Sequence, residues 1–275
     1  MATISLLSAK GSPGVTTTTV ALTMAWSGVH PGRCALAVDA DPIGGDTAAG
    51  VLRGAVPTSA GILPLATARG VDAHEALDSA CVHLRSDGSA RVLPGVPDGA
   101  RAAALPLAWD VLADLRADLH HAGTDVLVDA GRVDRAGLAA MDAAWLVDSD
   151  IAVLLVRPSL AAVMAAHRFV ADWPLAGVPL HLLVVSSESP YGPAEVGEAV
   201  GAPLLGVVAF DPASARVHSE GANPARGFER SEYARSLRQV AGDLGELAVA
   251  RADLHLPAPA LGDAVASPLA IEVHG

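Results

Sequence analysis

The sequence is poor in lysine and in cysteine. Of its 18 basic side chains a single one is a lysine, Lys10, and the other 17 are arginines. Cys34 and Cys81 lie far apart and belong to no CxxC or Cys/His pattern, which argues against a disulfide framework and a structural zinc site. No apolar run reaches the ~18 to 20 residues of a membrane span, and no basic stretch precedes the apolar N-terminal residues. We therefore expect a cytoplasmic protein without a membrane anchor.

Positive charge is also scarce overall. The formal net charge of -12 argues against a globally basic nucleic-acid binder. One locally basic stretch occurs late in the chain and contains Arg216, Arg226, Arg230, Arg235 and Arg238. Glutamates are interleaved with these arginines, which favours a solvated helix face. Nucleic acid thus stays a weakly supported alternative among the partners.

Apolar residues make up 51% of the chain, which is enough for one sizeable core. Short apolar runs predict strands at 3–8, 34–41, 125–131, 151–156, 180–185 and 204–208. Helical patterns separate these runs at 16–26, 107–121, 135–147, 159–173 and 193–200. Strands that alternate with helices predict an α/β fold, a mostly parallel sheet with helices on both faces.

We expect one domain, residues 1–251, followed by a flexible Ala/Pro-rich acidic tail at 252–275. Residues 50–106 are less regular and are interpreted as an insertion at the ligand edge. From Glu229 onward, apolar residues recur at spacings of four and three: Tyr233, Leu237, Val240, Leu244 and Leu247. This spacing favours a helix that packs on its own sheet over an intermolecular coiled coil.

A glycine-containing turn joins the first predicted strand to the first helix. Such a turn is an anion site, because free N–H groups and the positive end of the helix dipole converge there. Here the turn reads KGSPGVTT, residues 10–17. An ordinary P-loop reads GxxxxGK[ST], so the hydroxyl is present as Thr16, but Val15 occupies the lysine position.

The segment KGSPGVTT resembles the deviant Walker A loop KGGxGKTT of the MinD/ParA family of P-loop ATPases, with Lys10 at the signature lysine. The segments VDADPIGGD, VLVDAG and LLVRPSLAAV are also similar to that family, and the resemblance covers most of residues 3–247. Ser186 stands where an adenine-recognising asparagine is common. The resemblance implies ATP and Mg²⁺ as ligands and a homodimer in which the signature lysine reaches the partner's phosphates.

The resemblance also implies roles for individual residues. The nucleotide contacts would come from Lys10, Gly11, Ser12, Gly14, Val15, Thr16 and Thr17. Thr16 would hold Mg²⁺, together with Asp39 and, through water, Asp129. Asp41 would orient the attacking water, and with Lys10 it forms the expected catalytic pair. The sequence supports part of this independently, because Asp39 and Asp41 are two residues apart and share one side of a strand end.

Three departures from the family loop bear on the mechanism. Ser12 replaces a glycine, Pro13 removes an amide donor, and Val15 removes the cation nearest the transferred phosphoryl group. A unit charge about 4 Å from phosphate is worth up to ~4 kcal/mol at an effective dielectric of 20. Its loss would slow hydrolysis about a thousandfold unless another group compensates, whereas backbone amides and Mg²⁺ could still sustain binding.

Two functions follow from these observations. The first is an ATP-binding switch that dimerises around nucleotide, engages a protein partner and hydrolyses slowly, for partitioning, division-site placement or positioning of pili, flagella or secretion machinery. The alternative is a pseudo-ATPase scaffold that does not hydrolyse, or does not bind, nucleotide, and Val15 favours it. A weak ATPase activity, the hydrolysis of ATP to ADP and phosphate, is compatible with the first function and not with the second. A metabolic enzyme lacks support, since no convergent His/Asp set or G-x-S-x-G motif is present.

Overall fold

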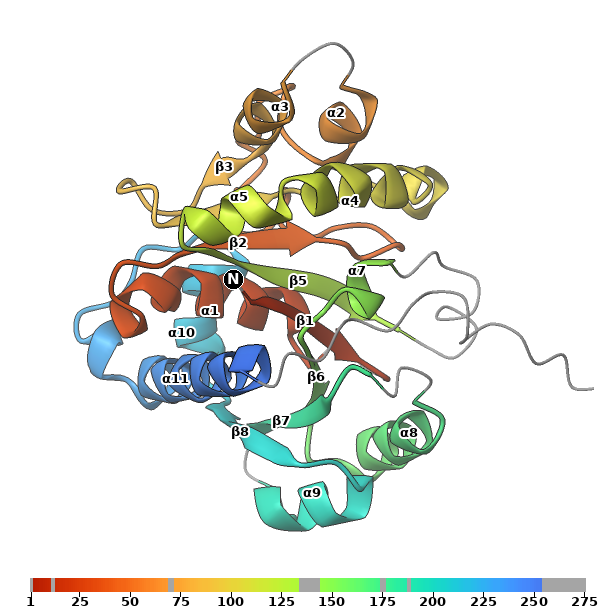
Figure 1. The fold of residues 1–275 in the computed structure, drawn as a ribbon. Helices are drawn as coiled ribbons and strands as arrows, with labels where there is room; N and C mark the ends of the chain where they lie inside the picture. Colours follow the sequence, from red (N-terminus) through yellow and green to blue (C-terminus); the bar gives the residue numbers. More distant parts are fainter. Residues whose placement is uncertain are drawn as a thin grey trace, which may run out of the picture.

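The computed structural model describes residues 2–10, 13–68, 72–133, 144–173, 177–186 and 189–253. These residues form an eight-stranded sheet in the order β3-β4-β2-β5-β1-β6-β7-β8 (Figure 1). All neighbouring strands are parallel except β3 and β4. The strands are β1 Thr3–Ser8, β2 Cys34–Asp39, β3 Val82–His83, β4 Ala90–Leu93, β5 Thr124–Arg132, β6 Ile151–Val156, β7 Leu180–Ser186 and β8 Leu204–Ala209.

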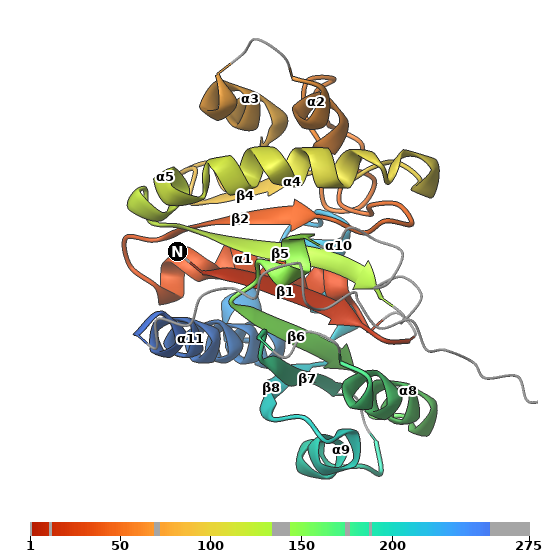
Figure 2. The same ribbon diagram turned by 45° about the vertical axis from the view of Figure 1, so that its right-hand side comes forward.

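Helices cover both faces of the sheet (Figure 2). The face that we call the α1 face packs against α1 Val15–Val29, α10 Pro212–Ser219 and α11 Glu232–Asp253. The opposite face packs against α2 Ile62–Thr67, α3 Ala73–Ala80, α4 Ala104–Asp114, α5 Arg116–His121, α7 Ala144–Val147, α8 Leu160–Ala171 and α9 Pro193–Val200. Two short 3-10 turns complete the described elements, at Gly99–Arg101 and Phe228–Arg230. The predicted α/β fold class is thereby confirmed.

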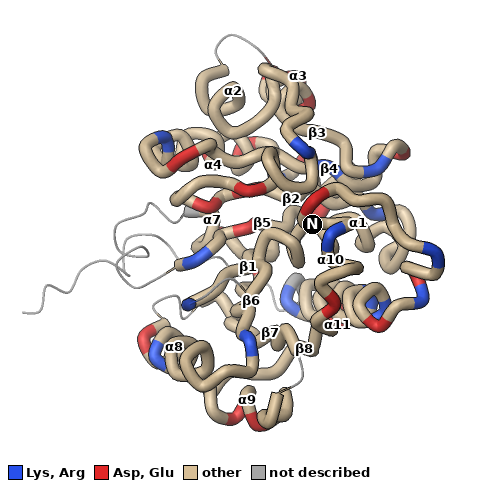
Figure 3. The backbone as a smooth tube through the Cα atoms, turned by 180° about the vertical axis from the view of Figure 1, so that it is seen from behind, with Lys and Arg blue, Asp and Glu red and all other residues tan. Residues whose placement is uncertain are grey.

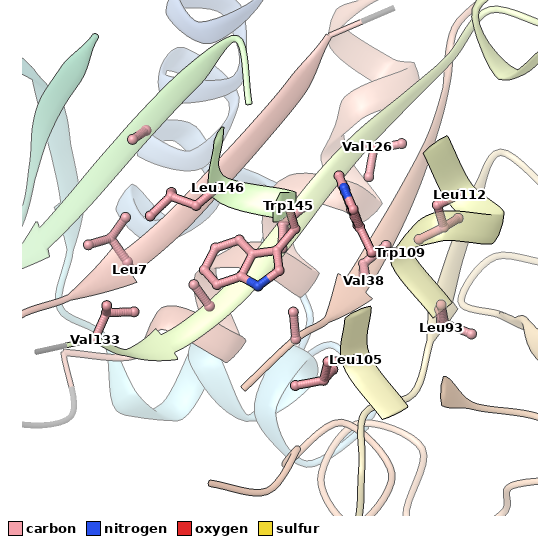
Figure 4. Packing of buried hydrophobic residues seen from close by; sticks show 14 of the residues in the cluster. Leu7, Val38, Leu93, Leu105, Trp109, Leu112, Val126, Val133, Trp145 and Leu146 are labelled. Atoms are coloured by element: carbon pink, nitrogen blue, oxygen red, sulfur yellow. The ribbon is translucent and has the colours of Figure 1, made fainter. Parts of the chain in front are cut away.

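The strands form because their sequences are apolar on both faces. Every residue of Ile151–Val156 is buried, as expected for a central parallel strand between two helix layers. On the opposite face, Figure 4 shows Leu7, Val133 and Leu146 around the indole of Trp145. This buried cluster fixes the ends of β1 and β5 with respect to α7.

Most of the predicted elements are confirmed, and β6 and α9 have the expected bounds. The helix predicted at 107–121 is divided in two at Leu115, where ψ is −1° and the side chain stays buried. Of the helix predicted at 135–147, α7 is the described part, and residues 134–143 lie outside the described residues. The tail at 254–275 also lies outside them.

Residues 50–106, interpreted from the sequence as a less regular insertion, include regular elements of the sheet and of one helix layer. They contain α2, α3, β3 and β4, and β4 pairs in parallel with β2 from Ala90 to Leu93. The run SARVLPGV, residues 89–96, is strand-like in composition, but no local feature of the sequence indicates its partner strand. This part of the chain therefore extends the sheet beyond β2.

Helix α11 packs on its own sheet, as the spacing of its apolar residues predicts. Tyr233, Leu237, Val240 and Leu244 are buried in the cluster of the α1 face, and Leu247 packs at its edge. Within the described ranges, no helix combines the length and the apolar character needed to cross a bilayer.

Candidate functional site

The candidate site lies where the central strands end. In the sheet β1 has β5 on one side and β6 on the other, and β2 lies beyond β5. Because these strands are parallel, their carboxyl ends share one edge, where ligands bind in open α/β sheets. Helix α1 begins at this edge, directly after the loop that follows β1. Figure 3 shows acidic segments at the ends of β2 and β5 on the same edge.

The first turn of α1 is open to an anion. Gly14 precedes the helix in the left-handed conformation (φ 96°), and no side chain caps the helix. The amides of the first turn consequently lack the side-chain acceptor that usually satisfies them. Thr16 and Thr17 are half-buried in that turn. Gly11 and Ser12, predicted as phosphate contacts, lie outside the described residues.

Val15 occupies the core. Its side chain is 6% exposed and belongs to the apolar cluster of the α1 face, together with Leu6 and Trp26. The position at which an ordinary P-loop carries its lysine is therefore filled by a packing side chain. Lys10 is exposed at the end of β1, and it forms no ion pair with a described residue.

Asp39 and Asp129 are register partners on β2 and β5, and each is 1% exposed. Asp39 Oδ2 accepts hydrogen bonds from the Thr47 amide (3.1 Å) and hydroxyl (2.6 Å). Asp129 Oδ1 accepts one from the Gly131 amide (2.9 Å). Asp39 Oδ1 and Asp129 Oδ2 are buried, and neither has a hydrogen-bond partner among the described residues.

The electrostatics of this pair favour a cation. Burial, reinforced by the neighbouring Asp39 carboxylate, raises the pKa of Asp129 to about 8, although Thr16 and Gly131 act in the opposite direction. Burial also raises the pKa of Asp39. Two carboxylates beside a threonine hydroxyl form a hard oxygen donor set of the kind that suits Mg²⁺. Within the described ranges, no cluster of three His, Cys, Asp or Glu side chains could hold a metal alone, so water or a ligand would have to complete the coordination.

Asp41 lies at the same edge. Its Oδ1 accepts a hydrogen bond from the Ile43 amide (2.9 Å). Burial, together with the nearby Asp46, raises the pKa of Asp41, and the positive charge of Arg132 lowers it. The three strand-end aspartates are thus brought to one edge of the sheet.

Several residues of this edge were not predicted from the sequence. Thr47 holds Asp39, and Gly45 and Gly95 enclose the same carboxyl group: a Cβ on Gly45 would lie 2.4 Å from Asp39 Oδ2, and a Cβ on Gly95 would lie 2.7 Å from Asp39 Cγ. Arg132 is exposed at the end of β5. The GG pair before Asp46 was the available signal, but nothing local indicates that the carboxyl group it contacts is Asp39.

The basic stretch near α10 and α11 is partly neutralised. Arg216 Nε lies 2.8 Å from Glu220 Oε2, and Arg238 Nη1 lies 2.9 Å from Glu229 Oε2. The glutamates predicted to interrupt the positive charge therefore pair with these two arginines. A cavity of about 730 Å³ lies nearby, between α1, α10 and α11, and none of the predicted site residues lines it.

A mostly parallel sheet with a glycine-containing loop after β1, and with acids near the carboxyl ends of β2 and β5, matches the P-loop NTPase class of fold. Within this class, the solved structures that are similar to the chain have the fold of the MinD/ParA type. The MinD proteins of Pyrococcus horikoshii, complexed with Mg-ADP, and Pyrococcus furiosus superpose with TM-scores of 0.67. They are 20% and 22% identical, with coverage of 90% of this chain and 97% and 100% of theirs.

A ParA family ATPase from Chlorobium tepidum is also similar, with a TM-score of 0.62, 17% identity and coverage of 87% of this chain and 97% of that one. Neither a family model nor a curated protein sequence matches the chain. At these identities the likeness establishes the fold, which is that of the MinD/ParA ATPases, and the function must be argued from the site.

Proposed function

We propose that this protein is a cytoplasmic ATP-dependent switch of the MinD/ParA type. It binds Mg-ATP at the carboxyl edge of the sheet, forms a homodimer around the nucleotide and presents that dimer to a protein partner. The observation that carries the proposal is the pair of unpartnered buried oxygens, Asp39 Oδ1 and Asp129 Oδ2, at the edge where α1 begins. Unsatisfied buried polar atoms are costly, and they are retained where a ligand completes them.

The described residues fit the nucleotide and the metal. The uncapped first turn of α1 would bind phosphate through its amides. Thr16, with Asp39 and Asp129, would hold Mg²⁺, which neutralises phosphate charge when bound. Asp41 would orient water at the same edge. The choice of ligand is supported by one neighbour, since the Pyrococcus horikoshii MinD structure contains Mg-ADP.

Dimerisation rests on Lys10. An exposed ammonium at the start of the phosphate loop, without an ion pair among the described residues, is available to a phosphate group of a second subunit. The cellular role of such a dimer would follow those of the neighbours, which include a septum site-determining protein, a MinC:MinD cell division complex and a plasmid partition protein. For this chain, a switch of that kind would need a partner that binds the dimer and the monomer with different affinities.

A second candidate is a scaffold of the same fold that does not hydrolyse ATP. The burial of Val15 in the apolar cluster favours it, because the loop then offers the transferred phosphoryl group no lysine of its own. Binding and turnover are therefore separate questions, and each needs its own measurement.

The test uses the single lysine. The protein is treated with an acylating reagent with no nucleotide, with Mg-ADP or with Mg-ATP, and modification of Lys10 is quantified by mass spectrometry against the N-terminal amine. We expect Mg-ATP to protect Lys10 and to double the mass measured by light scattering. Lys10→Ala should bind ATP but stay monomeric.

Two results would count against the switch. If Mg-ATP neither binds nor changes the mass of the wild-type protein, the proposal fails and the scaffold remains. If it binds and the mass doubles in Lys10→Ala as well, the dimer does not depend on this ammonium. Phosphate release, measured on the same samples, separates a slow ATPase from a non-hydrolysing dimer.

A further inference from the structure

Strand β5 contains one extra residue where it passes the end of β1. Leu6 of β1 pairs with Asp129, whereas Ser8 pairs with Arg132, so two steps along β1 correspond to three along β5. Gly131 lies within this irregularity and has a left-handed backbone (φ 61°). An insertion of this kind is a β-bulge, and bulges redirect the side chains that follow them.

The bulge determines the face on which Arg132 lies. Side chains alternate along a strand, and Val128 and Ala130 pack on the face opposite to α1. An unbroken alternation would place Arg132 with them. Instead Val133 packs there, and Figure 4 shows it beside Leu7. As the neighbour of Val133 in the chain and the register partner of Ser8, Arg132 is turned toward the α1 face.

This face is the one on which the phosphate loop enters α1. The Val133 amide donates to the Ser8 carbonyl (2.9 Å), so the backbone around Arg132 is fixed to the last residue of β1. Figure 3 shows basic segments at the ends of both β1 and β5. Arg132 is exposed, and it forms no ion pair with a described carboxylate.

Gly131 also brings Arg132 close to the strand-end acids. A Cβ on Gly131 would lie 2.0 Å from Asp41 Oδ2, so any side chain at this position would displace that carboxyl group. Arg132 directly follows Gly131 and ends β5, so its side chain starts at the sheet edge where Asp41 would orient water.

We propose that Arg132 is a phosphate-binding residue that supplies, within the same subunit, the positive charge that the phosphate loop lacks at Val15. This inference rests on the proposed function, because it assumes a nucleotide at this edge. A guanidinium group binds phosphate through two parallel hydrogen bonds, and it can do so from a strand end without occupying the helix. Lys10 would add a second charge from the facing subunit.

The experiment compares affinities for Mg-ATP and Mg-ADP, measured by isothermal titration calorimetry. The variants are Arg132→Ala, Arg132→Lys and, as a matched control, Arg168→Ala, which removes an exposed arginine from the last turn of α8. A charged hydrogen bond to phosphate is worth roughly a factor of ten in affinity. We expect Arg132→Ala to weaken ATP binding by about that factor and ADP binding less, Arg132→Lys to retain part of the affinity, and Arg168→Ala to change neither.

The outcomes separate this inference from the proposed function. If the wild type binds ATP and Arg132→Ala binds it equally well, the role of Arg132 is refuted while the switch stands. Equal losses for ATP and ADP would place the arginine away from the terminal phosphate and also refute the role proposed here. If the wild type binds no nucleotide, both proposals fail. Thermal unfolding of each variant checks that a lost affinity does not reflect a lost fold.

Discussion

The two ends of β5 carry two buried aspartates with opposite surroundings. At the start of the strand, Asp125 accepts hydrogen bonds from Arg33 Nε and Nη2 (2.6 Å each), the Trp26 indole (2.8 Å) and the Ala2 amide (2.6 Å). At the carboxyl end, Asp129 Oδ1 accepts a hydrogen bond from the Gly131 amide, and Asp129 Oδ2 has no partner among the described residues. Both oxygens of Asp125 therefore have hydrogen-bond donors within the fold, whereas one oxygen of Asp129 has none among the described residues.

The pKa values follow the same division. Burial alone would raise the pKa of Asp125, but the hydrogen bonds from Arg33, Ala2 and Trp26 outweigh it and hold that pKa below its usual range. Burial, with Asp39 beside it, raises the pKa of Asp129 to about 8. The start of the strand therefore uses its acid to stabilise the fold, whereas the carboxyl end keeps an acid that a cation would stabilise.

We expect the largest loss of stability from a substitution of Asp125, the aspartate at the start of β5 whose two carboxylate oxygens are hydrogen-bonded. Asp125→Ala removes a 2%-exposed carboxylate and leaves Arg33, Trp26 and the Ala2 amide without their acceptor. Breaking such a network costs about 3 kcal/mol in the free energy of unfolding. Asp78→Ala is the matched control, because its ion pair with Arg91 is exposed and is worth at most about 1 kcal/mol. Chemical denaturation measures both, and equal losses would break the comparison.

At the carboxyl edge of the sheet, a larger residue in place of Gly95 should lower the free energy of unfolding by overpacking the space around Asp39. A Cβ on Gly95 would lie 2.7 Å from Asp39 Cγ and 2.8 Å from its backbone oxygen, so Gly95→Ala forces the strand end to move. We expect a loss of about 2 kcal/mol from this overpacking. Gly28→Ala in α1 is the control, since no atom lies within 4 Å of its added Cβ, and the better helix former should leave stability equal or higher. Unchanged stability in Gly95→Ala would show that this edge is loosely packed.

The sequence predicted most of the strands and the shared edge, because apolar runs and strand-end acids are local signals. It also indicated a helix start near Val15 and acids near the carboxyl ends of β2 and β5. That these residues form a nucleotide site stays a prediction. It did not predict the pairing of β4 with β2, the enclosure of Asp39 by Gly45 and Gly95, or the bulge at Gly131. These features depend on the register between strands that are distant in the chain, and no local pattern encodes that register.

Val15→Lys tests whether the carboxyl edge of the sheet binds nucleotide, because it restores the lysine of an ordinary P-loop. The substitution puts an ammonium group at a position that is 6% exposed and packed in the apolar cluster. Without nucleotide it should cost about 1 to 2 kcal/mol, because the lysine stem must leave the cluster to reach solvent. With Mg-ATP it should raise affinity and allow measurable phosphate release. Val15→Met, which adds length without charge, is the control, and equal ATP binding by the two variants would exclude a charge effect.

We expect the smallest change in stability from a substitution of Asp129, whose Oδ2 has no hydrogen-bond partner among the described residues. At neutral pH the raised pKa keeps most of Asp129 protonated, so Asp129→Asn should change the free energy of unfolding by less than about 1 kcal/mol. The folded state binds a proton at Asp129 between pH 4 and pH 8 that the unfolded chain releases, so this group makes stability fall as pH rises through that window.

The same sign argument gives opposite pH profiles for the two ends. Asp125 contributes stability above its unfolded pKa near 4 and loses it as pH falls below that value. Thermal unfolding from pH 3 to pH 9 should therefore show a flatter neutral limb in Asp129→Asn and a flatter acid limb in Asp125→Asn. Mg²⁺ should restore stability above pH 7 in the wild type with ATP and not in Asp129→Asn, because the amide supplies no charge to the metal. If the stability of Asp129→Asn still falls with the wild-type slope near neutral pH, another group titrates in that range. Asp129 Oδ2 would then not be the oxygen that binds the cation.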